Sequence, residues 1–408
     1  MSNQLLTISM ITAESARVLS NNLVLAKCVN RDYDDEFAIK GAKIGQALNI
    51  RKPSKYSVRT GSVVDIQAQT ETYAPLTFTD PIGVDLSFTS QELTFSLDDF
   101  SNRVVHPAVV AIANKVDALG YALVNNSYNT VGTPGVALTS STARTAVLQA
   151  AAKLYDNLAP VGSPDMHFIS GSAFNALLSD STATIFNPQK NISDVYVKGL
   201  MGEFGGFTHY MGQQVASFTN ATFSGSPTML TTGSPQTGST LSTVGWGSGV
   251  TTLNAGQVFT IAGVYQVNAQ SKAVYGNLQE FTVTSTVSDS SGAIAALAIS
   301  PAIVTSGPLQ NVSAAPATSA AITVLGATGA VGQQAIGFHK DAIMLANQEL
   351  VLPSGVESAS YVRDEQTKIG IRVVSQYDIR TNQHITRFDT MVAWASLYEQ
   401  LLVRVFTA

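Results

Sequence analysis

The stretch LTFSLDDFSNRVVHPAVVAIANKVDALGYALVNN, residues 93–126, joins a strand pattern to a long helix pattern. Apolar and polar residues alternate over Leu93–Leu97, which is typical of a half-buried strand. Asp98 and Asp99 then open a helical region, where negative charge is favourable. Pro107 is expected to be the first residue of the main helix, because its missing N–H costs nothing there.

The main helix is predicted to be amphipathic and to end near Asn125-Asn126. At about 1.5 Å per residue it is about 30 Å long. A second alternating run, Val84–Phe88, precedes it and predicts another strand. The apolar residues of the helix recur at spacings of three and four, and they are Val109, Ile112, Val116, Leu119 and Leu123.

Upstream, residues 1–40 are expected to form an extended or helical arm, with a helix over Ile8–Leu25 whose apolar stripe is interrupted at Ser15. In residues 41–83, Gly and Pro flank a run of β-branched residues, which predicts a long, exposed β-hairpin. An acidic partner and plain solvation both remain open for the cations of this hairpin. These cations are Arg51, Lys52, Lys55 and Arg59.

Downstream, helix and strand patterns alternate, which favours an α+β domain. Helices are expected over Ser141–Leu158 and Ala173–Leu178, with a short strand at His167–Ile169 between them. The glycine-dense stretch Gly199–Phe207 predicts a loop that turns sharply or approaches another backbone closely.

From about Phe218 to residue 335 the chain is rich in Thr, Ser, Gly, Ala and Val and poor in charge, which predicts a separate β-rich domain. Strands of a small barrel are expected at Val258–Val264 and Phe281–Val287. At Ile336 the composition returns to that of the residues before Phe218. An inserted domain explains both the change near Phe218 and this return. The alternating run Ile369–Val374 and the hydrophobic end of the chain predict strands that are tied into the core.

Composition disfavours several classes of protein. The 408 residues are 45% hydrophobic but only 12% charged, against about 25% charged in typical soluble domains. A polar but neutral surface is compatible with close packing against identical neighbours. The net charge of -5 argues against a dedicated nucleic-acid binder. With neither a signal peptide nor about 18 uninterrupted apolar residues, neither export nor membrane spanning is expected.

The sequence contains none of the common catalytic motifs. It lacks a Gly-x-Ser-x-Gly elbow, a His-Glu-x-x-His pair and the Gly-Lys pair of a phosphate-binding loop. One cysteine and five histidines leave few ligands for a metal, and Cys28 is expected to be a buried small hydrophobe. His339, Lys340 and Asp341 are interpreted as a hydrogen-bond network at the end of a strand. No catalytic, cofactor or metal site is therefore predicted.

Three stretches, taken in order, carry a resemblance to a known family. They are residues 93–100 before the main helix, the barrel stretch GQVFTIAGV at residues 256–264, and FHKDA at residues 338–342 after the insert. The chain resembles the tailed-phage major capsid proteins of the Hong Kong 97 type. Among these it is most similar to the coat proteins of the P22-like short-tailed phages, the podoviruses, which carry an inserted β-barrel. The implied fold class is α+β.

The resemblance also implies a division into parts. The N-terminal arm is expected at residues 1–40, the extended loop at 41–83, the peripheral domain with the spine helix at 84–130, the axial domain at 131–217, the inserted β-rich domain at 218–335, and the return strands at 336–408.

The implied function is that of a major capsid protein, which self-assembles into the icosahedral head shell around double-stranded DNA. Copies are expected to form a homo-oligomer of pentamers and hexamers. Scaffolding and portal proteins are expected partners, packaged DNA is contacted weakly on the inner face, and no membrane is involved. Assembly is expected in the bacterial host cytoplasm, and the final location is the virion.

In this family the extended loop lies over a neighbouring subunit. Its cations are then expected to reach acidic residues of that neighbour, without a covalent cross-link, because members with an inserted domain resemble the non-cross-linking kind. The main alternative is a β-rich adhesin or receptor-binding protein, which does not explain the long helix, and an enzyme ranks third. The candidate interface residues are Arg51, Lys52, Lys55, Arg59, and the mixed-charge group Arg363, Asp364 and Glu365.

Overall fold

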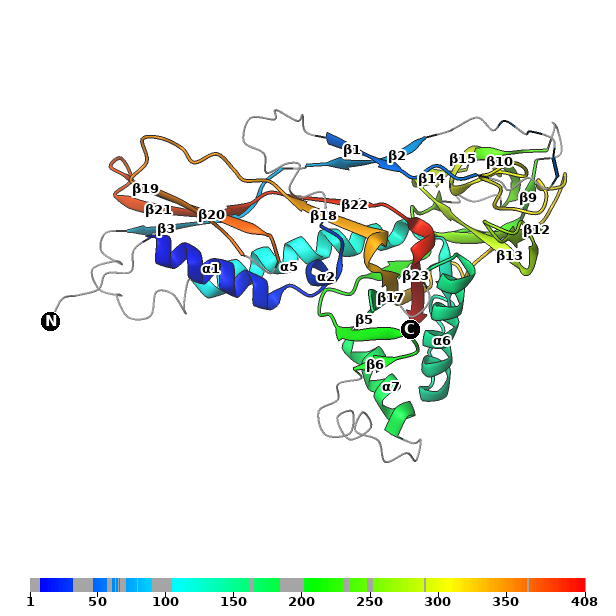
Figure 1. Cartoon of the computed structure of the whole chain (residues 1–408), viewed down its shortest axis with the longest axis horizontal. Coiled ribbons are helices and arrows are strands. Elements are labelled where there is room, and N and C mark those ends of the chain that lie inside the picture. The colour runs from blue at the N-terminus through cyan, green and yellow to red at the C-terminus, as the bar shows by residue number, and fades with distance from the viewer. Residues whose placement is uncertain are drawn as a thin grey trace. The chain divides into compact units, whose positions relative to one another are not determined.

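A computed structural model shows a mixed α and β protein, which confirms the predicted fold class (Figure 1). By its internal contacts the chain divides into two compact units, and each is described by itself. Unit 1 comprises Met1–Ile50, Ala74–Gly120 and Ile343–Ala395, and unit 2 comprises Arg51–Tyr73, Tyr121–Ala342 and Ser396–Ala408. The structure describes residues 8–31, 47–56, 61–62, 64, 66, 71–78, 80–89, 105–160, 164–183, 202–230, 235–247, 252–289, 291–364 and 367–407.

Unit 1 is built on a four-stranded antiparallel sheet of order β19-β20-β21-β3, and α1 contacts β19 and β20. The predicted strand Val84–Phe88 is confirmed as part of β3, which pairs with β21. The second predicted strand, Leu93–Leu97, and Asp98-Asp99 lie outside the described residues. The elements of this unit are α1 (Ile8–Asn22), α2 (Leu25–Cys28), α5 (His106–Ala122), β3 (Ile82–Thr89), β18 (Ile343–Asn347), β19 (Ser358–Arg363), β20 (Gly370–Asp378), β21 (Gln383–Thr390) and β22 (Val392–Ser396), the last paired with β18.

The long helix α5 confirms the periodicity of the sequence. It begins at His106, one residue before the predicted first residue Pro107, and the 3-10 turn η2 (Leu123–Asn126) extends it to the predicted end. Val109, Ile112 and Val116 are buried, as the spacing of three and four requires. The helix therefore supplies one apolar face to the core of unit 1.

A buried carboxylate of α5 holds the short helix α2. Both side-chain oxygens of Asp117 accept hydrogen bonds from the backbone N–H groups of Val24, Leu25 and Ala26, at 2.7, 3.3 and 3.2 Å. These N–H groups lie at the start of α2 and have no partners within the helix itself. Burial raises the pKa of Asp117, and the three hydrogen bonds oppose that rise. Asp117 thus acts in place of an N-cap side chain.

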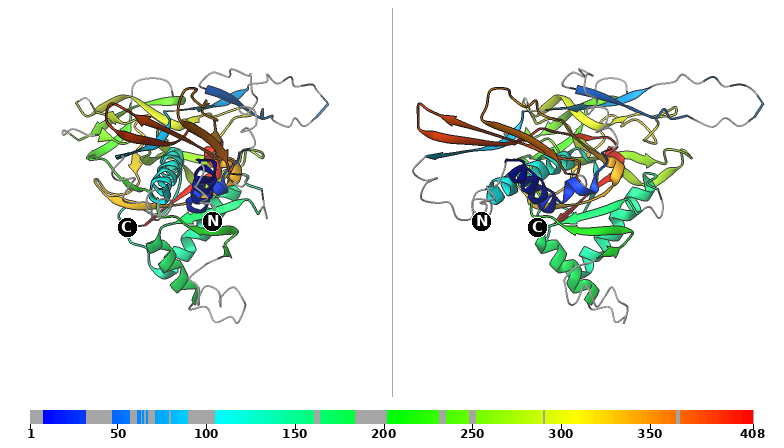
Figure 2. Two further views of the ribbon diagram at one scale, coloured as in Figure 1. Left: turned by 90° about the vertical axis from the view of Figure 1, so that its left-hand side faces the viewer. Right: turned by 60° about the vertical axis from the view of Figure 1, so that its left-hand side comes forward.

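Unit 2 contains a seven-stranded sheet in which β4, β23, β17, β5, β7 and β6 lie in this order and β8 pairs with β17. Figures 1 and 2 show α6 and α7 on one face of this sheet. The C-terminal strand β23 is buried along its whole length, so the end of the chain is tied into the core as predicted. The elements are β4 (Asn129–Val131), α6 (Ser140–Asp156), β5 (Met166–Ser170), α7 (Ser172–Ala183), β6 (Glu203–Phe204), β7 (Phe207–Met211), β8 (Ser217–Thr219), β17 (Val331–His339), η3 (Lys340–Ala342), η4 (Glu399–Leu401) and β23 (Leu402–Thr407).

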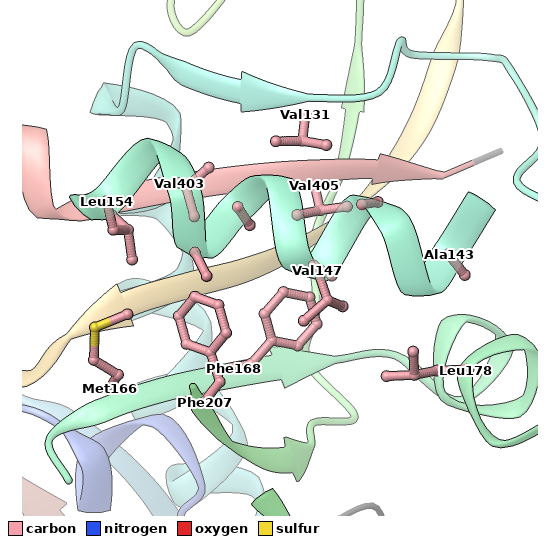
Figure 3. Close-up of a cluster of buried hydrophobic side chains, with 14 of the residues drawn as sticks. Val131, Ala143, Val147, Leu154, Met166, Phe168, Leu178, Phe207, Val403 and Val405 are labelled. Carbon is pink, nitrogen blue, oxygen red and sulfur yellow. The ribbon is translucent and has the colours of Figure 1, made fainter. Parts of the chain in front are cut away.

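The apolar core under α6 fixes its position on the sheet (Figure 3). Val147 and Leu154 of α6 are fully buried, together with Phe168 of β5 and Val403 of β23. The helix starts with a capping box in which the side chains of Thr139 and Thr142 each bond the other residue's backbone N–H.

The predicted sharp turn of the glycine-dense stretch is confirmed where that stretch is described. Gly205 and Gly206 join β6 to β7 with φ of 61° and 84°. Both values lie in the left-handed region that favours glycine, as a two-residue hairpin turn requires.

The inserted segment forms a nearly closed barrel. Its six strands have the order β16-β12-β13-β15-β10-β9, and an antiparallel bridge between Thr228 and Ala321 joins the two ends of this order. A separate apolar core that includes Phe259, Phe281 and Leu297 fills it. The strands are β9 (Gly225–Met229), β10 (Gly238–Trp246), β11 (Thr252–Leu253), β12 (Val258–Val267), β13 (Val274–Val283), β14 (Val287–Ser288), β15 (Ala293–Ile303) and β16 (Ile322–Val324).

One of the two predicted barrel strands is confirmed, and the other is confirmed only over its first three residues. Val258–Val264 lies within β12, but the predicted strand Phe281–Val287 crosses the end of β13 at Val283. Beyond that point the Thr284 N–H bonds the carbonyl of Ala298, and the chain bends before β14. The β-branched run continues after its pairing partner ends, so composition alone overestimates this strand.

The predicted basic hairpin contains the paired strands β1 (Ala47–Lys52) and β2 (Thr72–Thr77). Between them the structure describes residues 53–56, 61–62, 64, 66 and 71. The last residues of β1 and the first of β2 belong to unit 2. Their side chains form the first part of the candidate site.

Candidate functional site

The first candidate residue, Arg51, is paired within its own hairpin. Its Nη1 lies 3.7 Å from Oε2 of Glu71, and both side chains are largely exposed. An exposed pair of this kind contributes about 0–1 kcal/mol. Arg51 thus keeps most of its capacity to meet a further acidic group.

Lys52 has a different environment from the one the sequence suggested. Its Nζ lies 5.9 Å from the centroid of the Tyr398 ring, in a cation–π contact within unit 2. Burial lowers the pKa of Lys52, against the attraction of Glu399. Glu399 in turn accepts a short hydrogen bond from Ser300 of the barrel. Lys52 therefore contacts its own subunit at the base of the hairpin.

Lys55 is exposed, and Arg59 lies outside the described residues. The described tip of the hairpin also exposes large apolar side chains, which sequence reasoning did not single out. Tyr56, Val64 and Ile66 are 63%, 73% and 91% exposed. Exposed apolar groups concentrated on one segment mark an interaction surface.

Two residues of the mixed-charge group are described: Arg363 is the last residue of β19, and Asp364 follows it directly. Arg363 donates from Nε to the carbonyl of Lys368 at 2.7 Å. Asp364 accepts from the backbone N–H and the hydroxyl of Thr367 at 2.6 and 2.7 Å. Glu365 lies outside the described residues. Arg363 and Asp364 each stabilise their own hairpin turn.

A groove on the same four-stranded sheet was missed by sequence reasoning. It has a volume of about 380 Å³ and is lined by Val374, Gln376, Tyr377, Asp378, Ile385 and Arg387. Arg387 forms a bidentate pair with Asp85 of β3, at 2.7 and 2.9 Å, and this hydrogen bonding lowers the pKa of Asp85. Most of the lining residues alternate along β20 and β21, but β21 itself carries no clear strand pattern in the sequence.

His339 and Asp341 form a hydrogen-bond network at the end of a strand, as predicted. The backbone N–H of Asp341 donates to Nδ1 of His339 at 3.3 Å, where β17 passes into η3. Among the described residues, no group of three or more His, Cys, Asp or Glu side chains is arranged to hold a metal ion. Cys28 is buried in unit 1.

One helical stretch within the described part of the chain is long and apolar enough to cross a membrane, His106–Asn126, and half of its most apolar window is buried. The buried face of α5 explains this apolar character, because a core helix of a globular protein meets the same criterion.

The described residues combine a mixed sheet domain, a nearly closed barrel and a hairpin with exposed apolar and cationic side chains. The family model described as "P22 coat protein - gene protein 5" matches residues 2–400. The chain therefore belongs to the P22 coat protein family, and its function is that of a phage major capsid protein that forms the head shell.

Solved structures of phage capsid proteins are similar at low sequence identity. A chain of Mycobacterium phage Che8 is 11% identical with a TM-score of 0.48, covering 94% of this chain and 90% of that one. A capsid chain of cyanophage P-SCSP1u is 10% identical with a TM-score of 0.46, covering 89% and 84%. A mature capsid chain of bacteriophage PhiM1 is 8% identical with a TM-score of 0.45, covering 89% and 82%. A comparison with curated protein sequences gives no match.

Proposed function

We propose that copies of this major capsid protein assemble as pentamers and hexamers into a closed icosahedral shell around double-stranded DNA. The basic hairpin is the principal contact between neighbours in this proposal. The observation that carries it is the exposure of Val64 and Ile66 on a segment that also holds Arg51 and Lys55. Burial of these apolar side chains against a neighbour supplies affinity, and the cations supply orientation.

The groove over β20 and β21 is the surface that we assign to receive the hairpin of a neighbouring copy. It offers apolar side chains, Val374 and Ile385, beside the carboxylates Asp378 and Asp85. Such a surface complements a hairpin that carries both apolar and cationic groups.

The candidate interface residues divide into three groups under this proposal. Arg51, Lys55 and Arg59 contact the neighbour, whereas Lys52 anchors the hairpin base on Tyr398. Arg363, Asp364 and Glu365 are assigned to a second contact between subunits.

Membership of the P22 coat protein family supports the finer partner assignments. Scaffolding and portal proteins assist assembly in the bacterial host cytoplasm, and the virion is the final location. Packaged DNA is contacted weakly on the inner face, because a net charge of -5 gives little attraction to phosphates. The protein acts as a structural component and not as an enzyme.

We assign residues 218–335 to an inserted folding and contact module. Within unit 2, Glu280 of the barrel accepts from Lys153 Nζ at 2.6 Å and from the Thr130 backbone N–H at 2.8 Å. These bonds support an insert that is fixed on the sheet domain instead of being loosely tethered. A variant without the insert that still folds and assembles normally would contradict this role.

The test of the function is negative-stain electron microscopy with sedimentation of the purified chain, expressed with and without its phage partners. Closed shells, tubes or stable pentamers and hexamers are the expected result. A monodisperse monomer under every condition would overturn the proposal and favour an adhesin or an enzyme.

A further inference from the structure

The most buried cation among the described residues of unit 2 lies where the barrel meets the seven-stranded sheet. Arg404 of β23 is 0% exposed, and its backbone is paired with Ile336 of β17 and Thr130 of β4. Its Nη1 donates to the carbonyl of Gly256, in the barrel loop before β12, at 2.8 Å. The guanidinium thus links the C-terminal strand directly to the inserted domain.

The other nitrogens of the guanidinium lack hydrogen-bond acceptors among the described residues. Within the described part of the chain, Nε and Nη2 of Arg404 have no hydrogen-bond partner. Two aromatic rings lie close to its Cζ, Phe218 at 5.8 Å and Phe406 at 5.5 Å. These rings and the field of Glu280 offset part of the charge, but they accept no conventional hydrogen bond from the free N–H groups.

A buried acceptor that also lacks a partner lies on the same side of the sheet. Gln334 is two residues before Ile336, which pairs with Arg404, so the two side chains project from the same face. Its Nε2 donates to Oδ1 of Asn125 at 3.1 Å, whereas its Oε1 has no partner among the described residues. A Cβ on Gly256 would lie 2.8 Å from the Cβ of Asn125, so Asn125, Gly256 and Arg404 converge on one small region.

Buried donors without acceptors and a buried acceptor without a donor, on the same face of one sheet, are the conditions for an internal water site. A buried polar group left unsatisfied costs about 1–3 kcal/mol, and buried waters typically make about three hydrogen bonds each. A water accepts from Nε and Nη2 of Arg404 and still has a proton to donate to Oε1 of Gln334. A halide ion has no proton for Gln334, so it fits this set of groups less well.

We propose that an ordered water molecule is a structural ligand of this site, bridging the Arg404 guanidinium and the Gln334 amide at the junction of barrel and sheet. The site is independent of how the subunits contact one another. It makes the junction a hydrated polar layer, in contrast to the apolar core on the opposite face of the sheet.

The test is a cryo-electron microscopy or crystallographic map of the wild-type chain at about 2 Å resolution, in buffers with chloride and without any halide. The expected result is a peak within hydrogen-bond distance, about 2.7–3.2 Å, of both Arg404 and Gln334 Oε1 in both buffers. Direct contact between the two side chains without a peak would overturn the proposal. A peak that disappears without halide would overturn it as well, because it would identify an anion.

Two variants on neighbouring positions of β17 provide a matched pair. Gln334→Leu removes the acceptor and is expected to abolish the peak or move it away from position 334. Gln333→Leu, at an exposed position that faces the other way, is expected to leave the peak unchanged. An unchanged peak in both variants would contradict the assigned bridging geometry. If Gln334→Leu fails to fold, the wild-type map alone still decides the question.

Discussion

At the scale of single residues, Asp117 does more for unit 1 than its sequence context suggests. It lies in the middle of α5, where a carboxylate is normally solvated, but here it is buried and satisfies three N–H groups of α2. The apolar periodicity of the helix predicted its core face correctly, yet it gave no sign of this contact, because the partner backbone is about 90 residues away in sequence. A local pattern cannot report a bond between distant segments.

We predict that Asp117→Ala lowers the free energy of unfolding by about 3 kcal/mol, because it leaves buried N–H groups without acceptors. Urea unfolding followed by the fluorescence of Trp394 measures this, since that ring lies against α5 near Gly120. Glu203→Ala, at an exposed carboxylate, is the control and is expected to change stability little. Equal effects of the two substitutions would show that the hydrogen bonds of Asp117 are unimportant.

Asp117 also gives a pH dependence of defined sign. Burial raises its folded pKa above the ordinary value of 3.8, so the folded state holds this proton more tightly than the unfolded state does. As pH rises from 3.8 through the folded pKa, the wild type is expected to lose stability relative to Asp117→Asn. Unfolding free energies of both proteins between pH 3 and 6 test this. A relative gain of stability by the wild type over that range would reverse the assigned sign.

At the scale of elements, local pattern predicted α5, α6, β5 and β12 well. In each of these elements the apolar residues of the segment itself indicate which face is buried in the core. The strand β21 was not predicted, because its polar residues pair with β20 and with β3, which lies about 300 residues earlier. The groove was missed for the same reason, since it exists only after these strands come together.

The attachment of the barrel to the sheet depends on contacts between elements, and Glu280 makes two of them. We predict that Glu280→Gln weakens the junction, because Lys153 loses its ion pair and the Thr130 N–H keeps only a neutral acceptor. The free energy of unfolding is expected to fall by about 1–2 kcal/mol. Limited proteolysis is expected to cut the segments between barrel and sheet faster, while the barrel itself stays resistant. Glu349→Gln, at an exposed position, is the control, and faster cleavage there as well would argue against a specific junction.

At the scale of the whole molecule, a capsid subunit must fold stably by itself and also bind other copies of the same chain. Its few charges and the exposed apolar tip of the hairpin fit that requirement. We predict that the double variant Val64→Asp with Ile66→Asp folds normally but loses assembly, because charged groups cannot be buried at an apolar contact. Sedimentation velocity compares its shell fraction with that of wild type. A matched change at Val351→Asp, exposed but outside the hairpin, is expected to assemble.

Copies of the protein are proposed to join through the hairpin of one subunit and the grooved sheet of the next. The measurement that tests it most directly is a cryo-electron microscopy reconstruction of the assembled shell in which the hairpin is traced. Val64 and Ile66 are expected to be buried against the groove lined by Val374, Ile385 and Arg387 of a neighbouring copy. A shell in which the hairpin is exposed to solvent, or in which another surface fills that groove, would contradict it.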